Sequence, residues 1–222
     1  MSLAEAIDRL EELATEIKRE ALVDDKTSLG SALALRQEQR LNRASQTDSY
    51  VVVFGDLNDF KHINDDYSHE AGDVALRAVG EVIEKKIIKG LAAKAFRQSG
   101  DEFVIVLEHN SLVRFLARVA LFRNIPFSHN RRNLRTGMSL GYAVADGRAS
   151  FEELLQRADS ACQIAKRKTN SPIKKWTRDI ESNPLVRISG WCRSCKAKIS
   201  CTLPRNSAPP KVKRCPCCGK AL

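Results

Sequence analysis

Three carboxylates stand at positions where a β-sheet could bring them together. Asp56 ends an apolar run that is typical of a buried strand, and Asp101 and Glu102 occupy the tip of a predicted hairpin. Carboxylates at the ends of neighbouring strands can converge on one edge of a sheet, and such hard oxygen ligands suit Mg²⁺. Two bound Mg²⁺ ions can activate an attacking hydroxyl and stabilise a leaving pyrophosphate. Surface turns are often acidic, however, so composition alone leaves a solvated acidic edge as the alternative.

The elements that would position these carboxylates follow from the spacing of apolar residues. Strands are predicted at Tyr50–Leu57, Ala93–Arg97, Phe103–Glu108 and Thr136–Ala145. Helices are predicted at Asp59–Tyr67, Gly72–Ile88, Ser111–Leu121 and Ser150–Lys168. Cys162 lies in the apolar pattern of the last helix, and we expect it to be buried. The order of the elements indicates an α+β fold, a sheet of split β-α-β layout with helices packed on it.

Five ordered motifs resemble those of the GGDEF family, the diguanylate cyclases. They span about residues 24–170 and are the segments 56–65, 69–73, 97–103, 139–141 and 158–166. The resemblance implies a palm or nucleotidyl-cyclase-like fold with a central, mostly antiparallel sheet flanked by helices. It also implies a reaction in which two GTP condense to cyclic di-GMP and release two pyrophosphates. An antiparallel homodimer would carry out this reaction, with one GTP held by each subunit.

The same resemblance implies roles for individual residues. The ligands of two Mg²⁺ ions in each active site, which Mn²⁺ could replace, would be Asp56, Leu57 through its carbonyl, Asp101 and Glu102. Asp101 and Glu102 are the catalytic candidates, and Asp101 would assist the metals or help to deprotonate the 3′-hydroxyl. The substrate-binding candidates are Asp59, Phe60, Lys61, Asn64, Asp73, Gly100 and Lys166.

The types of these residues suit a guanine nucleotide. Backbone amides at residues 59–60 lie at a predicted helix start, where N–H groups and the helix dipole favour phosphate. Lys61 and Lys166 would add positive charge for the triphosphate, and Asn64 and Asp73 would read the base. A carboxylate such as Asp73 can accept both N1–H and N2–H of guanine, whereas adenine would set an acceptor against it.

Several positions depart from the family pattern. Ser99 replaces the first signature glycine, at a turn where we expect a positive φ and a cost of about 1 kcal/mol for serine. Lys26-Thr-Ser-Leu29 stands where the family has Leu-Thr-Gly-Leu. The Gly-Arg-Asn that would follow Lys166 is replaced, so an arginine contact to phosphate is shifted or lost. Residues 88–98 contain no Asp, so we expect no feedback inhibition by product at that site.

These departures leave two alternatives to an active cyclase. The first is a catalytically degenerate GGDEF domain that binds GTP or a dinucleotide as a signalling module. The second is a related cyclic oligonucleotide synthase of the CRISPR-polymerase type. The intact carboxylates favour the cyclase, whereas Ser99 and the altered phosphate contacts favour the binding module.

Positive charge and cysteine both concentrate toward the C-terminal end. The 222 residues have a formal net charge of +10, but residues 165–222 carry +13 and residues 1–164 carry −3. Two Cys-x-x-Cys pairs predict a zinc ribbon whose structural Zn²⁺ ligands would be Cys192, Cys195, Cys215 and Cys218. The basic residues around this ribbon predict an acidic protein partner or a nucleic acid, with a solubilising surface as the alternative.

The expected organisation is an N-terminal helix at 1–22, the GGDEF domain at 23–170, a linker at 171–189 and the zinc ribbon at 190–222. Apolar residues from Leu3 to Ala21 follow a heptad spacing. This predicts either a short parallel coiled coil between two chains or an amphipathic helix packed on its own domain. The start of the chain is too polar for a signal peptide, and no apolar run reaches the ~20 residues of a membrane helix. We therefore expect a cytoplasmic protein.

Overall fold

A computed structural model of the chain describes residues 3–44, 50–167, 172–177, 185–191 and 198–204. The chain divides into two compact units, Met1–Trp176 and Thr177–Leu222. The described strands of the first unit form a five-stranded sheet and a separate hairpin, and those of the second unit form a two-stranded sheet. The residues that the sequence selects for nucleotide chemistry all lie in the first unit.

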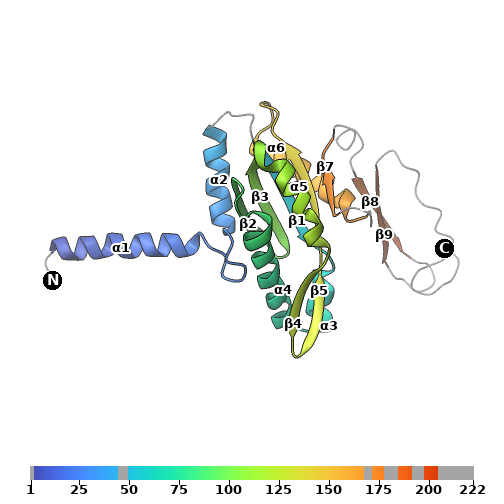
Figure 1. The fold of residues 1–222 in the computed structure, drawn as a ribbon, viewed down its shortest axis with the longest axis horizontal. Coiled ribbons are helices and arrows are strands. Elements are labelled where there is room, and N and C mark those ends of the chain that lie inside the picture. Colours follow the sequence, from blue (N-terminus) through green and yellow to red (C-terminus); the bar gives the residue numbers. More distant parts are fainter. Residues whose placement is uncertain (1–2, 45–49, 168–171, 178–184, 192–197, 205–222) are drawn as a thin grey trace. The chain divides into compact units, whose positions relative to one another are not determined.

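The first unit is built around the five-stranded sheet (Figure 1). In spatial order its strands are β2 (Ala93–Ser99), β3 (Glu102–Glu108), β1 (Tyr50–Leu57), β6 (Met138–Val144) and β7 (Ile173–Lys175). Neighbouring strands run antiparallel, except that β7 is parallel to β6. The chain therefore has the expected α+β fold with a mostly antiparallel sheet.

The central strand β1 is buried from Val51 to Leu57 because helices cover both faces of the sheet. Val51 and Val53 belong to one apolar cluster, and Val52 and Phe54 belong to the other. Successive side chains of a strand point to opposite faces, so each cluster takes every second residue. A strand buried on both faces reads as a continuous apolar run, which explains why the sequence predicts β1 so clearly.

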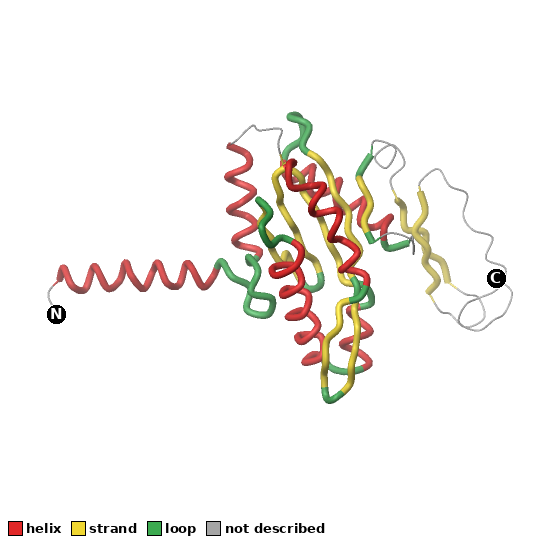
Figure 2. Tube along the Cα trace, in the orientation of Figure 1, coloured by secondary structure: helices red, strands yellow, loops and turns green. Residues whose placement is uncertain are grey.

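Helices pack on both faces of this sheet (Figures 1 and 2). One face is covered by α4 (His69–Val82) and α5 (Leu112–Arg118), and the other by α2 (Ala32–Ala44) and α6 (Phe151–Ala165). The short helix α3 (Phe60–Asp66) precedes α4, which continues as a π-helical turn, Ile83–Ile87. Over the described ranges, no helix combines the length and the apolar character that crossing a membrane requires.

Helix α6 packs directly against the backbone of β6 because Gly141 has no side chain. A Cβ at Gly141 would collide with the Ala158 carbonyl oxygen and the Cys162 amide nitrogen. The Cys162 thiol is buried and donates to the Ser139 carbonyl oxygen at 3.1 Å. Burial raises the pKa of this thiol to about 12. Cys162 is therefore a small buried packing residue, which confirms the prediction for it.

A hairpin of β4 (Ile125–His129) and β5 (Arg132–Thr136) has no counterpart among the predicted elements. Its turn residues Asn130 and Arg131 have φ values of 47° and 60°. Two positive φ values are typical of a tight type I′ turn, which usually contains glycine. The hairpin is anchored by the buried side chain of Phe127, which packs in a cluster with α4.

Two other segments differ from their predicted form. The helix expected at Ser111–Leu121 is the shorter α5, flanked by 3-10 turns at His109–Ser111 and Val119–Arg123. The linker expected at 171–189 contains β7, whose pairing with β6 extends the central sheet. Three residues are too few for a strand to show a clear alternation, so the sequence pattern gives little sign of β7.

The described residues of the second unit form two paired antiparallel strands, β8 (Leu185–Trp191) and β9 (Lys198–Pro204). The predicted zinc ligands Cys192, Cys195, Cys215 and Cys218 lie outside the described residues. The zinc ribbon therefore stays a prediction.

Helix α1 (Leu3–Ala21) presents its apolar seam to solvent. The exposed fractions of Ile7, Leu10 and Ile17 are 47%, 66% and 65%. Across the described part of the chain, the seam is thus not covered by the domain that follows it. Packing of this helix on its own domain is not what the structure has, and pairing of two chains stays a prediction.

Replacing Gly141 by alanine should destabilise the first unit, because the added methyl group would collide with backbone atoms of α6. We expect a loss of about 1–3 kcal/mol in the free energy of unfolding, measured by urea denaturation. Gln156→Ala, at an exposed position of α6, is the control and should change this free energy by less than about 0.5 kcal/mol. Equal stability of Gly141→Ala and the wild-type chain would contradict the close packing of α6 on β6.

Candidate active site

The acidic ends of β1 and β3 meet at one edge of the sheet. Asp56 in β1 is the cross-strand partner of Glu102 in β3 and of Ser139 in β6. The Leu57 amide donates to the Asp101 carbonyl oxygen at 3.1 Å, which ties the turn before β3 to the end of β1. The four residues that the resemblance proposed as metal ligands therefore share this edge.

Asp56 is a buried charge, with only 8% of the residue exposed. Its Oδ1 lies 2.6 Å from Lys166 Nζ, so the two groups form an ion pair. Burial raises the pKa of Asp56, and the charges of Asp101 and Glu102 raise it further, whereas Lys166 lowers it. A carboxylate removed from water is unfavourable unless positive charge compensates it, so this edge favours a cation.

The donor set at this edge fits Mg²⁺. Asp56 and Glu102 supply hard carboxylate oxygens from paired strands, and Asp56 is largely buried. Over the residues that the structure describes, no three Asp, Glu, His or Cys side chains are gathered closely enough to hold a metal ion. Mg²⁺ usually binds through one or two carboxylates together with substrate phosphates, so two carboxylates suffice.

Ser99 does not carry the backbone strain that the sequence predicted. It continues β2, pairs with Glu102 and lies outside the left-handed region. The positive φ, 38°, falls on Gly100, where a glycine is present. The Ser99 hydroxyl donates to Glu102 Oε2 at 2.6 Å. The expected cost of about 1 kcal/mol is therefore wrong, and Ser99 instead fixes the Glu102 carboxylate.

A largely buried ion pair attaches the turn at residues 99–102, called the signature turn below, to the loop that follows α1. The Arg97 guanidinium donates to the Gly100 carbonyl oxygen at 3.0 and 2.9 Å and to the Asp24 carboxylate at 3.1 and 3.3 Å. Asp24 also accepts from the amide and the hydroxyl of Thr27. Sequence reasoning assigns no role to Arg97 or Asp24. Asp-x-x-Thr is a recognisable turn pattern, but nothing local indicates its partner 73 residues away.

The two residues expected to read the base lie on α3 and α4, and the loop after α1 contacts one of them. Gly72 in α4 leaves room for Asn64 of α3, since a Cβ at Gly72 would overlap the Asn64 Oδ1. Asp73 follows Gly72, and its Oδ1 accepts a hydrogen bond from Lys26 Nζ at 2.5 Å. Lys26 is absent from the predicted site residues. Its single signal in the sequence is a basic residue where the family has leucine.

The remaining substrate-binding candidates have less defined surroundings. Asp59 precedes α3 with a φ of 55°, and its side chain makes no capping hydrogen bond. Phe60 is partly buried against the core, and Lys61 is exposed at the start of α3. Lys166 is the C-cap residue of α6, and its ion pair with Asp56 places its charge at the edge where Asp56 and Glu102 meet.

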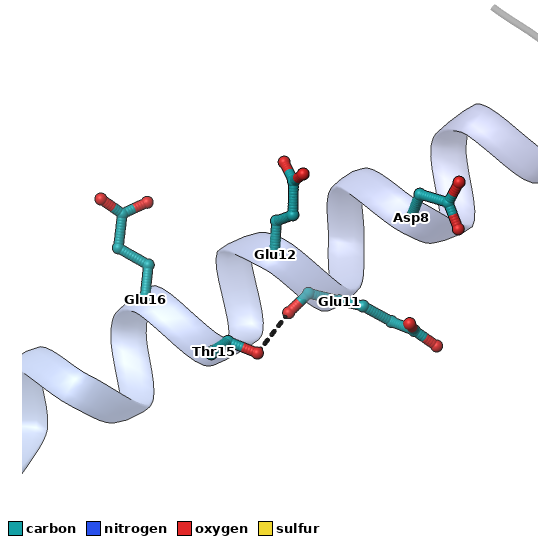
Figure 3. Close-up of a pocket in the computed structure, with 5 residues that line it drawn as sticks. All are labelled: Asp8, Glu11, Glu12, Thr15 and Glu16. Carbon is teal, nitrogen blue, oxygen red and sulfur yellow. Dashed lines mark hydrogen bonds between the residues drawn. The ribbon is translucent and has the colours of Figure 1, made fainter.

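A separate hollow lies along α1 (Figure 3). Its lining residues are Asp8, Glu11, Glu12, Thr15 and Glu16. The Thr15 hydroxyl donates to the Glu11 carbonyl oxygen at 2.8 Å, within the same helix. All of the lining residues belong to one exposed helix and most are acidic, so the hollow is a solvated acidic surface that would repel a nucleotide.

Comparisons with known proteins identify the family and the fold of the chain. The family described as "Diguanylate cyclase, GGDEF domain" matches residues 21–172, so the chain belongs to the GGDEF family. Diguanylate cyclase DosC of Escherichia coli (strain K12) is 30% identical over 186 residues, which are 79% of this chain and 40% of DosC. Cyclic di-GMP phosphodiesterase PdeB of Shewanella oneidensis is 33% identical over 174 residues, which are 75% of this chain and 20% of PdeB.

A solved structure has the same fold. It contains the coiled coil and GGDEF domain of DgcB from Caulobacter crescentus in complex with c-di-GMP. The TM-score is 0.66 at 22% identity, and the match covers 78% of this chain and 94% of the DgcB chain. By contrast, the present chain spans less than half the length of DosC and of PdeB.

Neutralising Asp56 should stabilise the protein. The pKa of Asp56 is higher in the folded state than its value of about 4 in the unfolded state. The stability that the protonated carboxyl contributes is therefore fully present below about pH 4, and it is lost as the pH rises through the folded pKa and the buried carboxyl becomes charged. Asp56→Asn is neutral throughout, and without added metal its Tm at about pH 7 should exceed that of the wild type. The difference should shrink toward about pH 4, where the wild-type carboxyl also becomes neutral.

Thermal unfolding across this pH range measures the effect. Asp65→Asn, which removes an exposed carboxylate of α3, is the control and should leave Tm nearly unchanged. A Tm for Asp56→Asn below that of the wild type at neutral pH would show that the pair with Lys166 outweighs the burial of Asp56.

Proposed function

We propose that this chain is a Mg²⁺-dependent diguanylate cyclase that acts as a homodimer on two GTP. The observation that carries the proposal is the pairing of Asp56 with Glu102, beside a turn attached through Arg97, in a chain of the GGDEF family. In each half-reaction a 3′-oxygen bonds to an α-phosphorus, the bond from that phosphorus to the pyrophosphate oxygen breaks, and the 3′-hydroxyl proton leaves. Ring closure needs two such reactions in opposite directions, so two copies of the site must face each other.

Each residue at the metal edge has a task that its chemistry supports. Asp56, Glu102 and the Leu57 carbonyl would hold Mg²⁺, and phosphate oxygens would supply further ligands. Bound Mg²⁺ would supply the positive charge that stabilises the α-phosphate and the leaving pyrophosphate. Asp101 would take the 3′-hydroxyl proton, and the Lys166 ammonium would add positive charge for the triphosphate.

The choice of GTP rests on the residues at the base-reading end. Asp73 is about one-third exposed, with 34% of its side chain accessible, so a ligand can reach it. Its carboxylate would accept two N–H groups of guanine, and Asn64, held beside Gly72, would add an amide. Adenine would place a lone pair against the carboxylate. The carboxylate would then be removed from water without gaining a hydrogen bond, which is unfavourable.

The main alternative is a domain that binds GTP or a cyclic dinucleotide without turnover. One reason for it was Ser99, whose extended conformation and hydrogen bond to Glu102 support the cyclase instead. The relatives carry names of both cyclases and a phosphodiesterase, and this chain spans only a fifth of the latter. A cyclic oligonucleotide synthase would differ from the cyclase in its nucleotide or in the size of its product.

The purified full chain, incubated with labelled GTP and Mg²⁺, should form cyclic di-GMP with two pyrophosphates for each product. ATP should give none. Glu102→Gln should lower the rate by at least about 100-fold, because it removes a charge at the reacting phosphate. Glu108→Gln, exposed at the other end of β3, is the control and should keep the wild-type rate. Chromatography of the products decides the case: GTP binding without any dinucleotide contradicts the cyclase, and larger rings indicate a synthase.

We also propose that the C-terminal unit holds one structural Zn²⁺ on Cys192, Cys195, Cys215 and Cys218. The surrounding basic residues would then form a surface for an acidic protein or a nucleic acid. Elemental analysis of the full chain should find about one zinc per chain. Replacing Cys192 and Cys195 together by serine should remove it, whereas Cys201→Ala should not. A full chain that is prepared without chelator and contains no zinc would contradict the proposal.

A further inference from the structure

The loop after α1 places an ammonium group at the base-reading end of the site. Lys26 Nζ lies 2.5 Å from Asp73 Oδ1, although the two residues are 47 positions apart in the sequence. The side chains are 37% and 34% exposed, so neither is sealed from a ligand. Asp73 adjoins Gly72, against which Asn64 packs. A cation and a carboxylate therefore meet at α4, one residue along from the glycine against which the Asn64 amide packs.

The backbone that carries Lys26 is held from several sides. The Asp24 amide donates to the Leu29 carbonyl oxygen at 2.8 Å, and the Ser28 amide donates to the Asp24 carbonyl oxygen at 2.9 Å. Thr27 is buried, and a Cβ at Gly80 of α4 would collide with its carbonyl oxygen. The loop is therefore packed against α4, which also carries Asp73. This packing and the hydrogen bonds of the loop hold the backbone of Lys26 in place.

We propose that Lys26 is a specificity-determining residue that donates to the O6 oxygen of guanine while Asp73 accepts from the same edge. This inference rests on the proposed binding of GTP. The edge of guanine presents, in order, the O6 acceptor, the N1–H donor and the N2–H donor. If one carboxylate oxygen accepts N1–H and the other accepts N2–H, the O6 of guanine lies beside the carboxylate oxygen that accepts N1–H. An ammonium group paired with that carboxylate oxygen can therefore also donate to O6.

Adenine reverses this pattern at both groups. It presents an amino group where guanine has O6, and a lone pair where guanine has N1–H. The amino group would face the Lys26 ammonium, donor against donor, and the lone pair would face the Asp73 carboxylate. Lys26 thus adds a second mismatch for adenine beside the one at Asp73.

A purely structural pair would have the opposite effect on binding. If Lys26 served only to occupy Asp73, guanine would have to displace it, and removing the ammonium would strengthen GTP binding. As a surface ion pair between partly exposed groups, it would add little to the stability of the fold. The sign of the change in affinity therefore separates the two roles.

The test measures equilibrium binding to the full chain in the presence of Mg²⁺. The probes are the 3′-deoxy triphosphates of guanosine, inosine and adenosine, which lack the attacking hydroxyl and cannot react. Inosine keeps O6 and N1–H but lacks the N2 amino group. Lys26→Met should weaken binding of the guanosine and inosine probes by about 10-fold each, and should leave the weak binding of the adenosine probe unchanged or improved.

Two further variants make the result specific. Lys94→Met removes an ammonium paired with Glu38 at 2.7 Å, outside the site, and should alter none of the three affinities. Lys26→Arg keeps a cationic donor and should retain most of the preference for guanine. Thermal unfolding should give Lys26→Met a Tm close to that of the wild type.

Three outcomes would overturn the inference. Unchanged or tighter binding of the guanosine probe to Lys26→Met would show that the lysine merely occupies Asp73. Equal weakening for all three probes would show that its charge serves the triphosphate and not the base. Failure of the wild-type chain to bind the guanosine probe at all would overturn the proposed cyclase itself, a result that the Lys26 variants cannot produce.

Discussion

The structure depends on a carboxylate placed where burial makes its charge unfavourable. Asp56 ends the central strand, whose two faces are covered by helices, so its charge is largely removed from water. Lys166 compensates this charge from the end of α6. It reaches that position because Gly141 lets α6 pack on the backbone of β6. With Glu102 on the neighbouring strand, the edge concentrates negative charge that a divalent cation would neutralise.

The second constraint is the pair of Arg97 and Asp24, which connects the two ends of the candidate site. Arg97 holds the signature turn through the carbonyl of Gly100, and Asp24 organises the loop that carries Lys26. Lys26 in turn meets Asp73. One guanidinium group therefore joins the edge with the metal-ligand candidates to the loop that contacts the base-reading candidate Asp73.

The sequence predicts most reliably what local patterns determine. Strand β1 has its predicted bounds because burial on both faces leaves a continuous apolar run, and the meeting of the strand-end carboxylates follows from strand pairing. The contact of Lys26 with Asp73 joins distant segments, so no local pattern indicates it. The β4–β5 hairpin escapes prediction because its turn at residues 130–131 lacks glycine. For Ser99 the expectation was wrong because Ser99 pairs with Glu102, so the turn between them is formed by Gly100 and Asp101 and the positive φ falls on Gly100.

The loop beside Arg97 also begins at the last residue of α1. The Ser31 hydroxyl donates to the Ala21 carbonyl oxygen at 2.7 Å, and the Ser31 amide donates to the Leu22 carbonyl oxygen at 2.9 Å. The loop is thus closed at its base, and Asp24 follows α1 after only two intervening residues. Because only two residues separate α1 from Asp24, a rotation of α1 would reach the turn at Gly100 through the Asp24–Arg97 ion pair.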